Sequence, residues 1–152
     1  MIIGTEDPTT PDVVRLLEEH LADMYAASPA ESVHALDPAA LAGPGVSFWT
    51  LRADGVVLGT AALKEIDPTH GEIKSMRTRA GARRRGVARA LLEHLLATAV
   101  ERGYARVSLE TGTQEFFAPA RALYVSRGFV ACGPFASYEA DPHSAFYTLS
   151  LD

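Results

Sequence analysis

The hydrophobic period of the chain changes from that of strands to that of a long helix at an arginine- and glycine-rich segment that covers residues 79–86. Ahead of it, over residues 46–78, short apolar runs are separated by turn sequences, which is typical of consecutive β-strands. Behind it, over residues 87–100, apolar side chains recur at helical spacing and form a broad face. A strand must therefore pass through a short loop directly into a long helix, which favours folds that combine a sheet with covering helices.

The segments on either side of this change predict a mixed sheet. Three strands joined by tight turns predict an antiparallel meander over Val46–Arg52, Val56–Ile66 and Glu72–Thr78. The helix over Gly86–Arg102 and the strand over Tyr104–Glu110 complete a strand–helix–strand unit, whose right-handed crossover gives parallel pairing. We therefore predict an α/β fold with a mixed, mainly antiparallel central sheet of about six to seven strands and about four flanking helices.

The two ends of the chain supply the other predicted elements. Apolar residues at helical spacing behind Thr10-Pro11 predict a helix over Pro11–Ala27. The remaining predicted elements are a strand over residues 1–4, a short helix over Pro38–Leu41 within the loop 28–45, a helix over Pro119–Arg127, a strand from Phe129 and a strand over Ala145–Leu151. No repeat or linker divides the 152 residues, and this length predicts one domain over residues 1–152.

The composition argues against several kinds of partner. A net charge of −5 at pH 7 disfavours nucleic acid and anionic membrane surfaces, since both need a positive protein surface. The mean hydropathy is +0.04, and no apolar run approaches the ~20 residues of a membrane span. Cys132 is the only cysteine and the histidines are scattered, so neither a disulfide nor a metal site is expected. The start of the chain lacks signal-peptide features, and a reducing cytoplasm is the expected location.

Half of the basic residues of this acidic chain lie in one short part of it. Of the 14 Lys and Arg residues, this part contains Lys74, Arg77, Arg79, Arg83, Arg84, Arg85 and Arg89. The first amides of a helix have no intrahelical acceptor and lie at the positive end of the helix dipole. An anionic ligand such as a phosphate is therefore expected where this segment meets the helix. A solvated surface or a nucleic-acid patch is the alternative interpretation.

One motif within this segment resembles a known family. The pattern Arg-x-x-Gly-x-Ala at residues 83–88 resembles the acetyl-CoA-binding motif of the GNAT (GCN5-related N-acetyltransferase) superfamily. It lies between a strand and a helix, and residues 120–129 resemble the superfamily's Ala-x-x-Leu-Tyr-x-x-x-Gly-Phe segment. Residues 71–77, 109–112 and 138–146 are in addition similar to a group of small bacterial members, the YsnE-like proteins.

The resemblance implies that acetyl-CoA is the acetyl donor and indicates where it binds. The pyrophosphate is expected on amides around Arg84–Arg89, and the pantetheine arm as a pseudo-strand along Met76–Thr78, where two strands splay apart. Arg84 or Arg85 is a candidate for the 3′-phosphate of CoA. The implied cofactor-binding residues are Met76, Arg77, Thr78, Arg83, Arg84, Arg85, Gly86, Val87, Ala88 and Arg89.

The resemblance also implies catalytic residues. Tyr124 matches the tyrosine that protonates the departing thiolate in many members, although a packing role is the alternative. Glu72, Glu65 and Glu110 are candidates for the base that deprotonates an amine. Strand alternation predicts one face with Glu72, Lys74 and Met76 and the other with Ile73, Ser75 and Arg77.

In one position the chain departs from the family pattern. Many members carry an Asn about seven residues before the tyrosine, and here that position is Phe117. The contribution of this Asn to CoA binding is then lost, or it is supplied by another group such as Gln114 or Thr113.

The expected function is that of an N-acetyltransferase that moves acetyl from acetyl-CoA to a primary amine of a small molecule, by direct attack in a ternary complex. Transfer to a protein or peptide, or a catalytically silent acyl-CoA-binding sensor, are the alternatives. The acceptor is expected to bind against residues 25–47, where His34 is either a lining residue or a structural one. Many relatives form dimers, so a homodimer is a further expectation.

Overall fold

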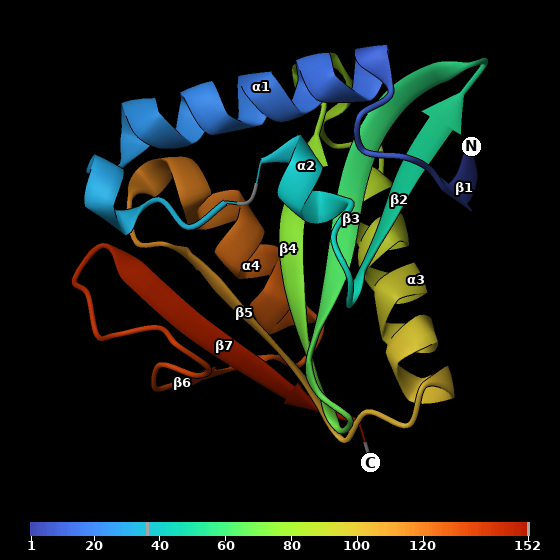
Figure 1. Ribbon diagram of the computed structural model, residues 1–152. Coiled ribbons are helices and arrows are strands. Elements are labelled where there is room, and N and C mark those ends of the chain that lie inside the picture. The colour runs from blue at the N-terminus through green and yellow to red at the C-terminus, as the bar shows by residue number, and fades with distance from the viewer. Residues whose placement is uncertain (36, 152) are drawn as a thin grey trace.

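A seven-stranded sheet forms the centre of the computed structural model, which describes residues 1–35 and 37–151 (Figure 1). The strands, in the spatial order β1-β2-β3-β4-β5-β7-β6, are β1 (Ile2–Thr5), β2 (Val46–Ala53), β3 (Val56–Asp67), β4 (His70–Thr78), β5 (Arg106–Gly112), β7 (Ser144–Ser150) and β6 (Val130–Cys132). The helices are α1 (Pro11–Ala27), α2 (Pro38–Leu41), α3 (Val87–Glu101) and α4 (Ala118–Ser126). Residue 36 of the expected acceptor segment and residue 152 lie outside the described residues.

The pairing of the strands confirms the predicted fold class. β4 and β5 are parallel neighbours, and the other neighbouring pairs are antiparallel. α3 forms the crossover between β4 and β5, as the strand–helix–strand pattern predicts. The helix predicted over Pro11–Ala27 has the same bounds in the structure.

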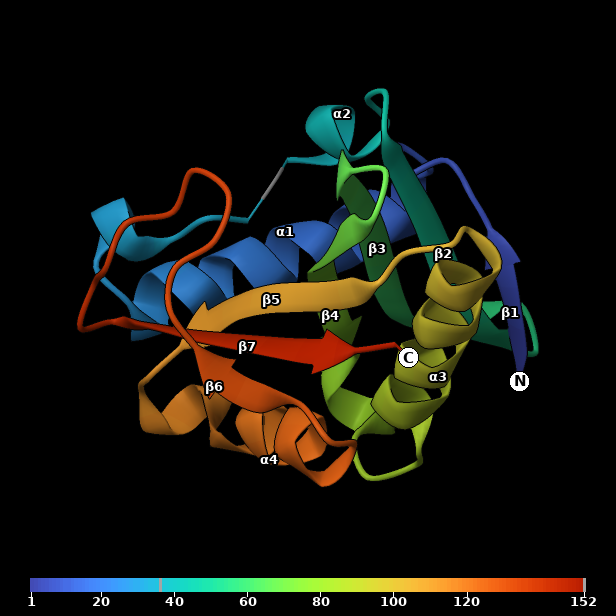
Figure 2. The ribbon, with the colours of Figure 1, turned by 90° about the horizontal axis from the view of Figure 1, so that it is seen from below.

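Helices cover both faces of the sheet. α1 and α2 lie over one face and α3 and α4 over the other (Figure 2). The side chains that α3 buries are Val87, Leu91, Leu92, Leu95, Leu96 and Ala99. A smaller cluster beneath α1 consists of Val13, Leu17, Leu41, Phe48 and Ala62. Burial of these two apolar helix faces holds the layers together, since each Å² of apolar surface removed from water stabilises the fold by about 25 cal/mol.

The fifth strand begins two residues later than the periodicity predicts. Gly103 follows α3 with φ +79°, and the amide of Tyr104 donates to the carbonyl of Ala99 at 3.0 Å. Tyr104 therefore completes the helix end, together with Gly103, and does not start β5 as predicted. The Tyr104 side chain, which suggested a strand residue, is 4% exposed and packs against Gly71 of β4.

A β-bulge in β4 corrects the predicted faces of this strand. Thr60 of β3 pairs with Arg77, and Ala62 pairs with Lys74. The one residue between these pairs on β3 therefore lies opposite two residues of β4, Ser75 and Met76. Ser75, at φ +52°, absorbs the extra residue, and Thr60 Oγ1 donates to its carbonyl at 2.8 Å. Arg77 is therefore on the same face as Lys74.

Met76 accordingly changes sides as well. It packs against the cluster beneath α3, which also contains Ile73, so these two residues share a face. The prediction that Met76 faces the same way as Glu72 was wrong, because strict alternation holds only where no residue is inserted.

β4 and β5 separate after a short stretch of pairing. Their register runs from His70↔Arg106 to Ile73↔Leu109 and ends there. Beyond this point β4 continues along β3 and β5 continues along β7, so the two strands diverge (Figure 1). The part of β4 from Lys74 onward thus has one unpaired backbone edge inside the sheet.

The start of α3 rests directly on β3. A Cβ atom placed on Gly59 would lie 2.6 Å from Val87 Cγ1 and 2.9 Å from the carbonyl oxygen of Arg77. Glycine therefore allows the first turn of α3 to pack closely against the sheet, beside the end of β4. Val87 is 1% exposed, so its side chain anchors the start of α3 in the core.

We predict that Gly59→Ala lowers the free energy of unfolding by about 1–3 kcal/mol, because the added methyl group overpacks the contact with Val87. Denaturant unfolding measures this difference. Gly4→Ala on β1 is the matched control, since no atom lies within 4 Å of a Cβ placed there. Equal effects of the two substitutions would contradict the close approach of α3 to β3.

Candidate active site

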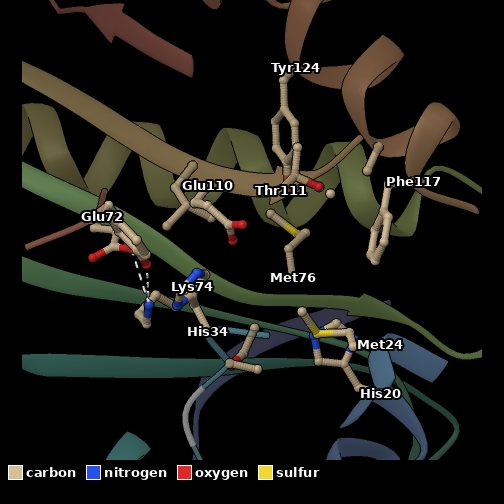
Figure 3. Close-up of a pocket in the computed structure, with 16 residues that line it drawn as sticks. His20, Met24, His34, Glu72, Lys74, Met76, Glu110, Thr111, Phe117 and Tyr124 are labelled. Atoms are coloured by element: carbon tan, nitrogen blue, oxygen red, sulfur yellow. Dashed lines mark hydrogen bonds and ion pairs between the residues drawn. The ribbon is translucent and has the colours of Figure 1, made fainter. Parts of the chain in front are cut away.

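A cavity of about 90 Å³ occupies the place where β4 and β5 separate. Residues from both sides of the sheet line it (Figure 3). They are His20 and Met24 of α1, His34 and Ala35 of the following loop, Glu72, Ile73, Lys74, Ser75 and Met76 of β4, Glu110, Thr111 and Gly112 of β5, Phe117, Ala120, Tyr124 and Tyr138. The structure thus brings Tyr124, Glu72 and Glu110 to one cavity, together with Met76.

Tyr124 reaches the cavity from α4. It is 4% exposed, and its ring lies against Phe129 with a centroid separation of 5.7 Å. Burial raises the pKa of the Tyr124 phenol above its ordinary value of 10.0. The hydroxyl therefore remains protonated at neutral pH and can donate a proton to a stronger base formed beside it.

A buried polar cluster lies at the β4 side of the cavity. Lys74 Nζ contacts Glu72 Oε2 at 3.1 Å and donates to the hydroxyl oxygen of Tyr138 at 2.8 Å. The Tyr138 hydroxyl donates to the same Glu72 oxygen at 2.5 Å. Burial and the neighbouring Glu72 carboxylate raise the pKa of Tyr138, which keeps this hydroxyl a donor. The Glu72 carboxylate and the Lys74 ammonium thus form an ion pair, and each is also hydrogen-bonded to the hydroxyl of Tyr138, a loop residue.

Glu110 faces the same cavity from β5. Ser144 Oγ donates to Glu110 Oε2 at 2.7 Å. Burial raises the pKa of the Glu110 carboxyl above its ordinary value of 4.5, and the hydrogen bond from Ser144 only partly opposes this shift. A carboxylate whose pKa is shifted toward neutrality is suited to taking a proton from a bound group.

A second, more open hollow of about 480 Å³ adjoins the cavity. The two share His34, Ala35, Glu72, Lys74 and Tyr138 in their walls. Glu65 lines the outer hollow, where it is exposed and accepts a hydrogen bond from the Tyr104 hydroxyl at 2.9 Å. The structure does not bring Glu65 to the inner cavity with Tyr124.

α1 closes the inner cavity from the other side. Asp23 binds Arg77 with an Oδ2–Nη1 distance of 2.7 Å and so ties α1 to β4. Burial, together with the charge of Arg77, lowers the pKa of His20 to about 4, so this side chain is neutral at pH 7. Met24 and neutral His20 thus form an uncharged wall opposite β5.

The loop between β4 and α3 leaves the start of the helix without a cap. Gly86 is the N-cap residue, with φ +79° and no side chain to accept from the first amides. Arg84 is also left-handed, with φ +65°. The side chains of Arg83, Arg84 and Arg85 are exposed. Free amides and exposed guanidinium groups together suit an anionic ligand.

The other basic residues of this segment have different partners. Arg77 is 7% exposed and bound to Asp23, Arg79 Nε donates to the carbonyl of Val57 at 2.8 Å, and Arg89 Nη2 donates to Ser126 Oγ at 3.0 Å. The guanidinium of Arg77 therefore faces α1, so only its backbone lies along the unpaired edge. Lys74 belongs to the buried cluster described above. The basic segment thus divides between two separate sites.

Phe117, which stands at the family's asparagine position, lines the cavity itself. Its ring packs on Gly112, where a Cβ atom would lie 2.3 Å from Phe117 Cδ2. Gln114 is engaged by Ser28 and His143, and Thr113 Oγ1 donates to the carbonyl of Pro142 at 2.9 Å. Neither of these two side chains lines the cavity.

Tyr138, His20 and Met24 line the cavity although no motif of the sequence pointed to them. Tyr138 comes from the loop between β6 and β7, and its ring packs edge-on against His34 at 5.1 Å. Residues 138–146 are similar to the YsnE-like proteins, but this similarity does not indicate a function for Tyr138. The helical pattern of α1 placed His20 and Met24 on a helix but could not show which strand it would cross.

Neither a metal site nor a membrane-spanning helix is present in the part of the chain that the structure describes. No group of three or more His, Cys, Asp or Glu side chains in residues 1–35 and 37–151 is arranged to hold a metal ion. Among the same residues, no helix is both long enough and apolar enough to cross a membrane.

A mixed sheet that opens between two parallel strands, beside an uncapped helix start, agrees with the fold of the GNAT acyltransferases. The chain matches the model of the acetyltransferase (GNAT) family over residues 13–129. It is 50% identical to the uncharacterized N-acetyltransferase YsnE of Bacillus subtilis over 99% of this chain and 100% of that protein. It is 47% identical to the uncharacterized N-acetyltransferase YedL of Escherichia coli over 98% of this chain and 94% of that protein.

Structural comparison agrees with these relatives. A putative acyl-CoA N-acyltransferase from Klebsiella pneumoniae superposes with a TM-score of 0.82 at 26% identity, over 99% of this chain and 97% of the other. The chain therefore belongs to the GNAT family and is an acetyltransferase of the YsnE-like group.

Glu110→Gln should change how stability depends on pH. Because the pKa of Glu110 is raised above 4.5 by burial, the folded protein keeps a proton that the unfolded chain has lost. As the pH rises from about 4.5 toward neutrality, the free energy of unfolding of the wild-type protein should therefore fall relative to that of the Gln variant. Denaturant unfolding between about pH 4 and about pH 8 measures it. Glu18→Gln, at an exposed position on α1, is the control, and a pH-independent difference for Glu110→Gln would contradict the shift.

Proposed function

We propose that the protein transfers the acetyl group of acetyl-CoA to a primary amine of a small molecule, by direct attack of the amine in a ternary complex. One observation carries this proposal. The uncapped start of α3 and the cavity with Tyr124 and Glu110 lie at the two ends of the same unpaired edge of β4. An extended ligand along this edge would have its phosphates at one end and its reactive group at the other.

The residues along this edge fit acetyl-CoA, which supplies the acetyl group as a thioester. The unpaired backbone of Met76–Thr78 suits an extended pantetheine arm, because an open strand edge offers hydrogen-bond partners to a second strand. The amides of Val87, Ala88 and Arg89 suit the pyrophosphate. Arg84 and Arg85 have exposed guanidinium groups and are candidates for the 3′-phosphate.

We assign the general base to Glu110. An alkylammonium acceptor, with a pKa of about 10, must lose a proton before its nitrogen can attack the thioester carbonyl. Glu110 has a raised pKa and an oxygen with no hydrogen-bond partner recorded in the described residues, whereas Glu72 is held by Lys74 and Tyr138. Glu65 is in the outer hollow. Glu110 is therefore better suited to the proton transfer than either of the other two carboxylates.

Tyr124 is the proposed acid. As the carbon–nitrogen bond forms and the carbon–sulfur bond breaks, the Tyr124 hydroxyl gives its proton to the departing sulfur. Its raised pKa keeps the hydroxyl protonated at neutral pH, and burial of the developing thiolate in the same cavity raises the proton affinity of the sulfur as well. Glu110 accepts one proton from the ammonium group before the attack, and the second proton, which the nitrogen loses as the amide forms, restores the Tyr124 hydroxyl. The acid thus acts from α4 and the base from β5.

The shape of the site favours a small acceptor. The inner cavity is enclosed by α1, by the loop at His34 and by Tyr138, and its outer hollow of about 480 Å³ lies in the range of ordinary small-molecule sites. Acetyl-CoA along β4 and an acceptor in the outer hollow would approach Glu110 from different directions. This arrangement suits direct transfer without an acyl-enzyme.

Tyr124→Phe should lower kcat by about 10²-fold or more while changing the KM for acetyl-CoA little, because it removes only the proton donor. Tyr25→Phe, at a 56%-exposed position on α1, is the matched control and should retain activity. Steady-state measurement of CoA thiol release gives both constants. An unchanged kcat in Tyr124→Phe would mean that the tyrosine is a packing residue.

A screen for acetyl-CoA-dependent thiol release tests the function itself, with amino acids, polyamines, aminoglycosides and peptides as acceptors. We expect turnover with one or more small amines that depends on Tyr124 and Glu110. Turnover confined to peptides would instead indicate a protein or peptide acetyltransferase. Tight acetyl-CoA binding without turnover of any amine would indicate a sensor and overturn the proposal.

A further inference from the structure

Lys74 is a buried cation at the junction of the two hollows. Its side chain is 9% exposed and that of Glu72 is 4% exposed. Both residues belong to the walls of the inner cavity and of the outer hollow. Figure 3 shows the Lys74–Glu72 contact beside His34, at the mouth of the inner cavity.

The polar groups of this pair are only partly used. A lysine ammonium has three N–H donors, and Lys74 directs two of them to Glu72 Oε2 and to the Tyr138 hydroxyl. Both recorded hydrogen bonds to Glu72 end on Oε2, and within the described residues none ends on Oε1. One N–H donor and one carboxylate oxygen therefore remain side by side for a ligand.

Stability alone does not explain this pair. A buried ion pair loses hydration on both partners, and apolar side chains of similar size often stabilise a fold as well or better. The positions of Lys74 and Glu72 in the walls of both hollows instead suggest that a ligand completes the cluster.

We propose that the acceptor is a small zwitterion of the free amino acid class, with its carboxylate bound by Lys74 and its ammonium held between Glu72 and Glu110. This inference rests on the proposed function, whose acceptor site it specifies. An α-amino acid carries its ammonium and its carboxylate on one carbon. These two groups match the Glu72 carboxylate and the Lys74 ammonium, whose oxygen and nitrogen are 3.1 Å apart in the protein. Its amine then lies beside Glu110, the base, at the cavity that contains Tyr124.

The charges of the outer hollow agree with this class of acceptor. Lys64 and Lys74 line this hollow together with Glu65 and Glu72. The walls therefore offer charges of both signs, which suits a ligand that carries both an ammonium and a carboxylate.

Matched acceptors test the inference on the wild-type protein. Each set contains a free amino acid, its amide and its decarboxylated amine, for example phenylalanine, phenylalaninamide and phenethylamine. We expect kcat/KM for the free acid to exceed that of the two others by about 10-fold or more, since they lack the group that Lys74 binds. Equal or better transfer to the amide, the amine or a polyamine would overturn this inference and leave the proposed function intact. Transfer to none of the acceptors, peptides included, would overturn both.

Lys74→Met assigns the effect to this side chain. The substitution keeps most of the length of the side chain and removes its charge. It should lower kcat/KM for the free acid by about 10- to 10²-fold while the decarboxylated amine changes by only a few-fold, so that the preference disappears. Lys64→Met, at the other lysine of the outer hollow, is the matched control and should keep the preference.

Product binding supplies a measurement that does not need turnover. Thermal shift with N-acetylphenylalanine and with N-acetylphenethylamine should show binding of the acid by the wild-type protein and by Lys74→Arg, which retains the charge, and weak binding by Lys74→Met. The melting temperature without ligand reports in the same experiment whether each variant folds. Equal binding of both compounds by the wild-type protein would overturn the inference.

Discussion

The early end of the pairing between β4 and β5 is the constraint on which the site depends. A parallel pair in the middle of a sheet normally continues to the strand ends, since unpaired backbone groups are costly to bury. Here the pairing stops at Ile73↔Leu109, and the bulge at Ser75 bends β4 away immediately afterwards. The result is an unpaired strand edge inside the fold, which is covered by side chains of α1 and α4 and is available to an extended ligand.

The polar groups in this opening are arranged at some cost to the fold. Glu110 is held where burial disfavours its charged form, and Lys74 and Glu72 are almost fully buried. Each arrangement is less favourable than an apolar core would be, and the large apolar cluster beneath α3 offsets the difference. The concentration of such groups in one cavity, with conventional packing elsewhere, is the distribution expected when a site needs particular protonation states.

The elements of the fold could be predicted from the sequence because each carries its own periodicity, and α1 and α2 have the predicted bounds. The cavity could be predicted only in part. Tyr124 and Met76 came from motifs, but the faces of β4 were wrong beyond Ser75, because an inserted residue leaves no mark in a pattern of alternating side chains. The cluster at Lys74 was missed because it depends on Tyr138, which is distant in sequence and lies in a loop without periodicity. The sequence favoured Glu72 as the base over Glu65 and Glu110, because the burial and the hydrogen bonds that support Glu110 exist only in the folded chain.

The division of the basic segment explains how an acidic protein can have a strongly cationic stretch. Arg77 is neutralised by Asp23 and Lys74 by Glu72, so these two charges are used inside the fold. The exposed arginines that remain are at the loop before α3, where Arg84 adopts φ +65°, a conformation that costs a non-glycine residue about 1 kcal/mol or more. Such strain persists only where the surrounding structure imposes it, and here Val87 holds the helix against Gly59 while Arg79 is bound to the carbonyl of Val57. The loop is therefore held at both ends. Its exposed arginines and the free amides of α3 are concentrated at the end of β4, where both can contact the same anionic ligand. Basic residues scattered over the surface could not do this.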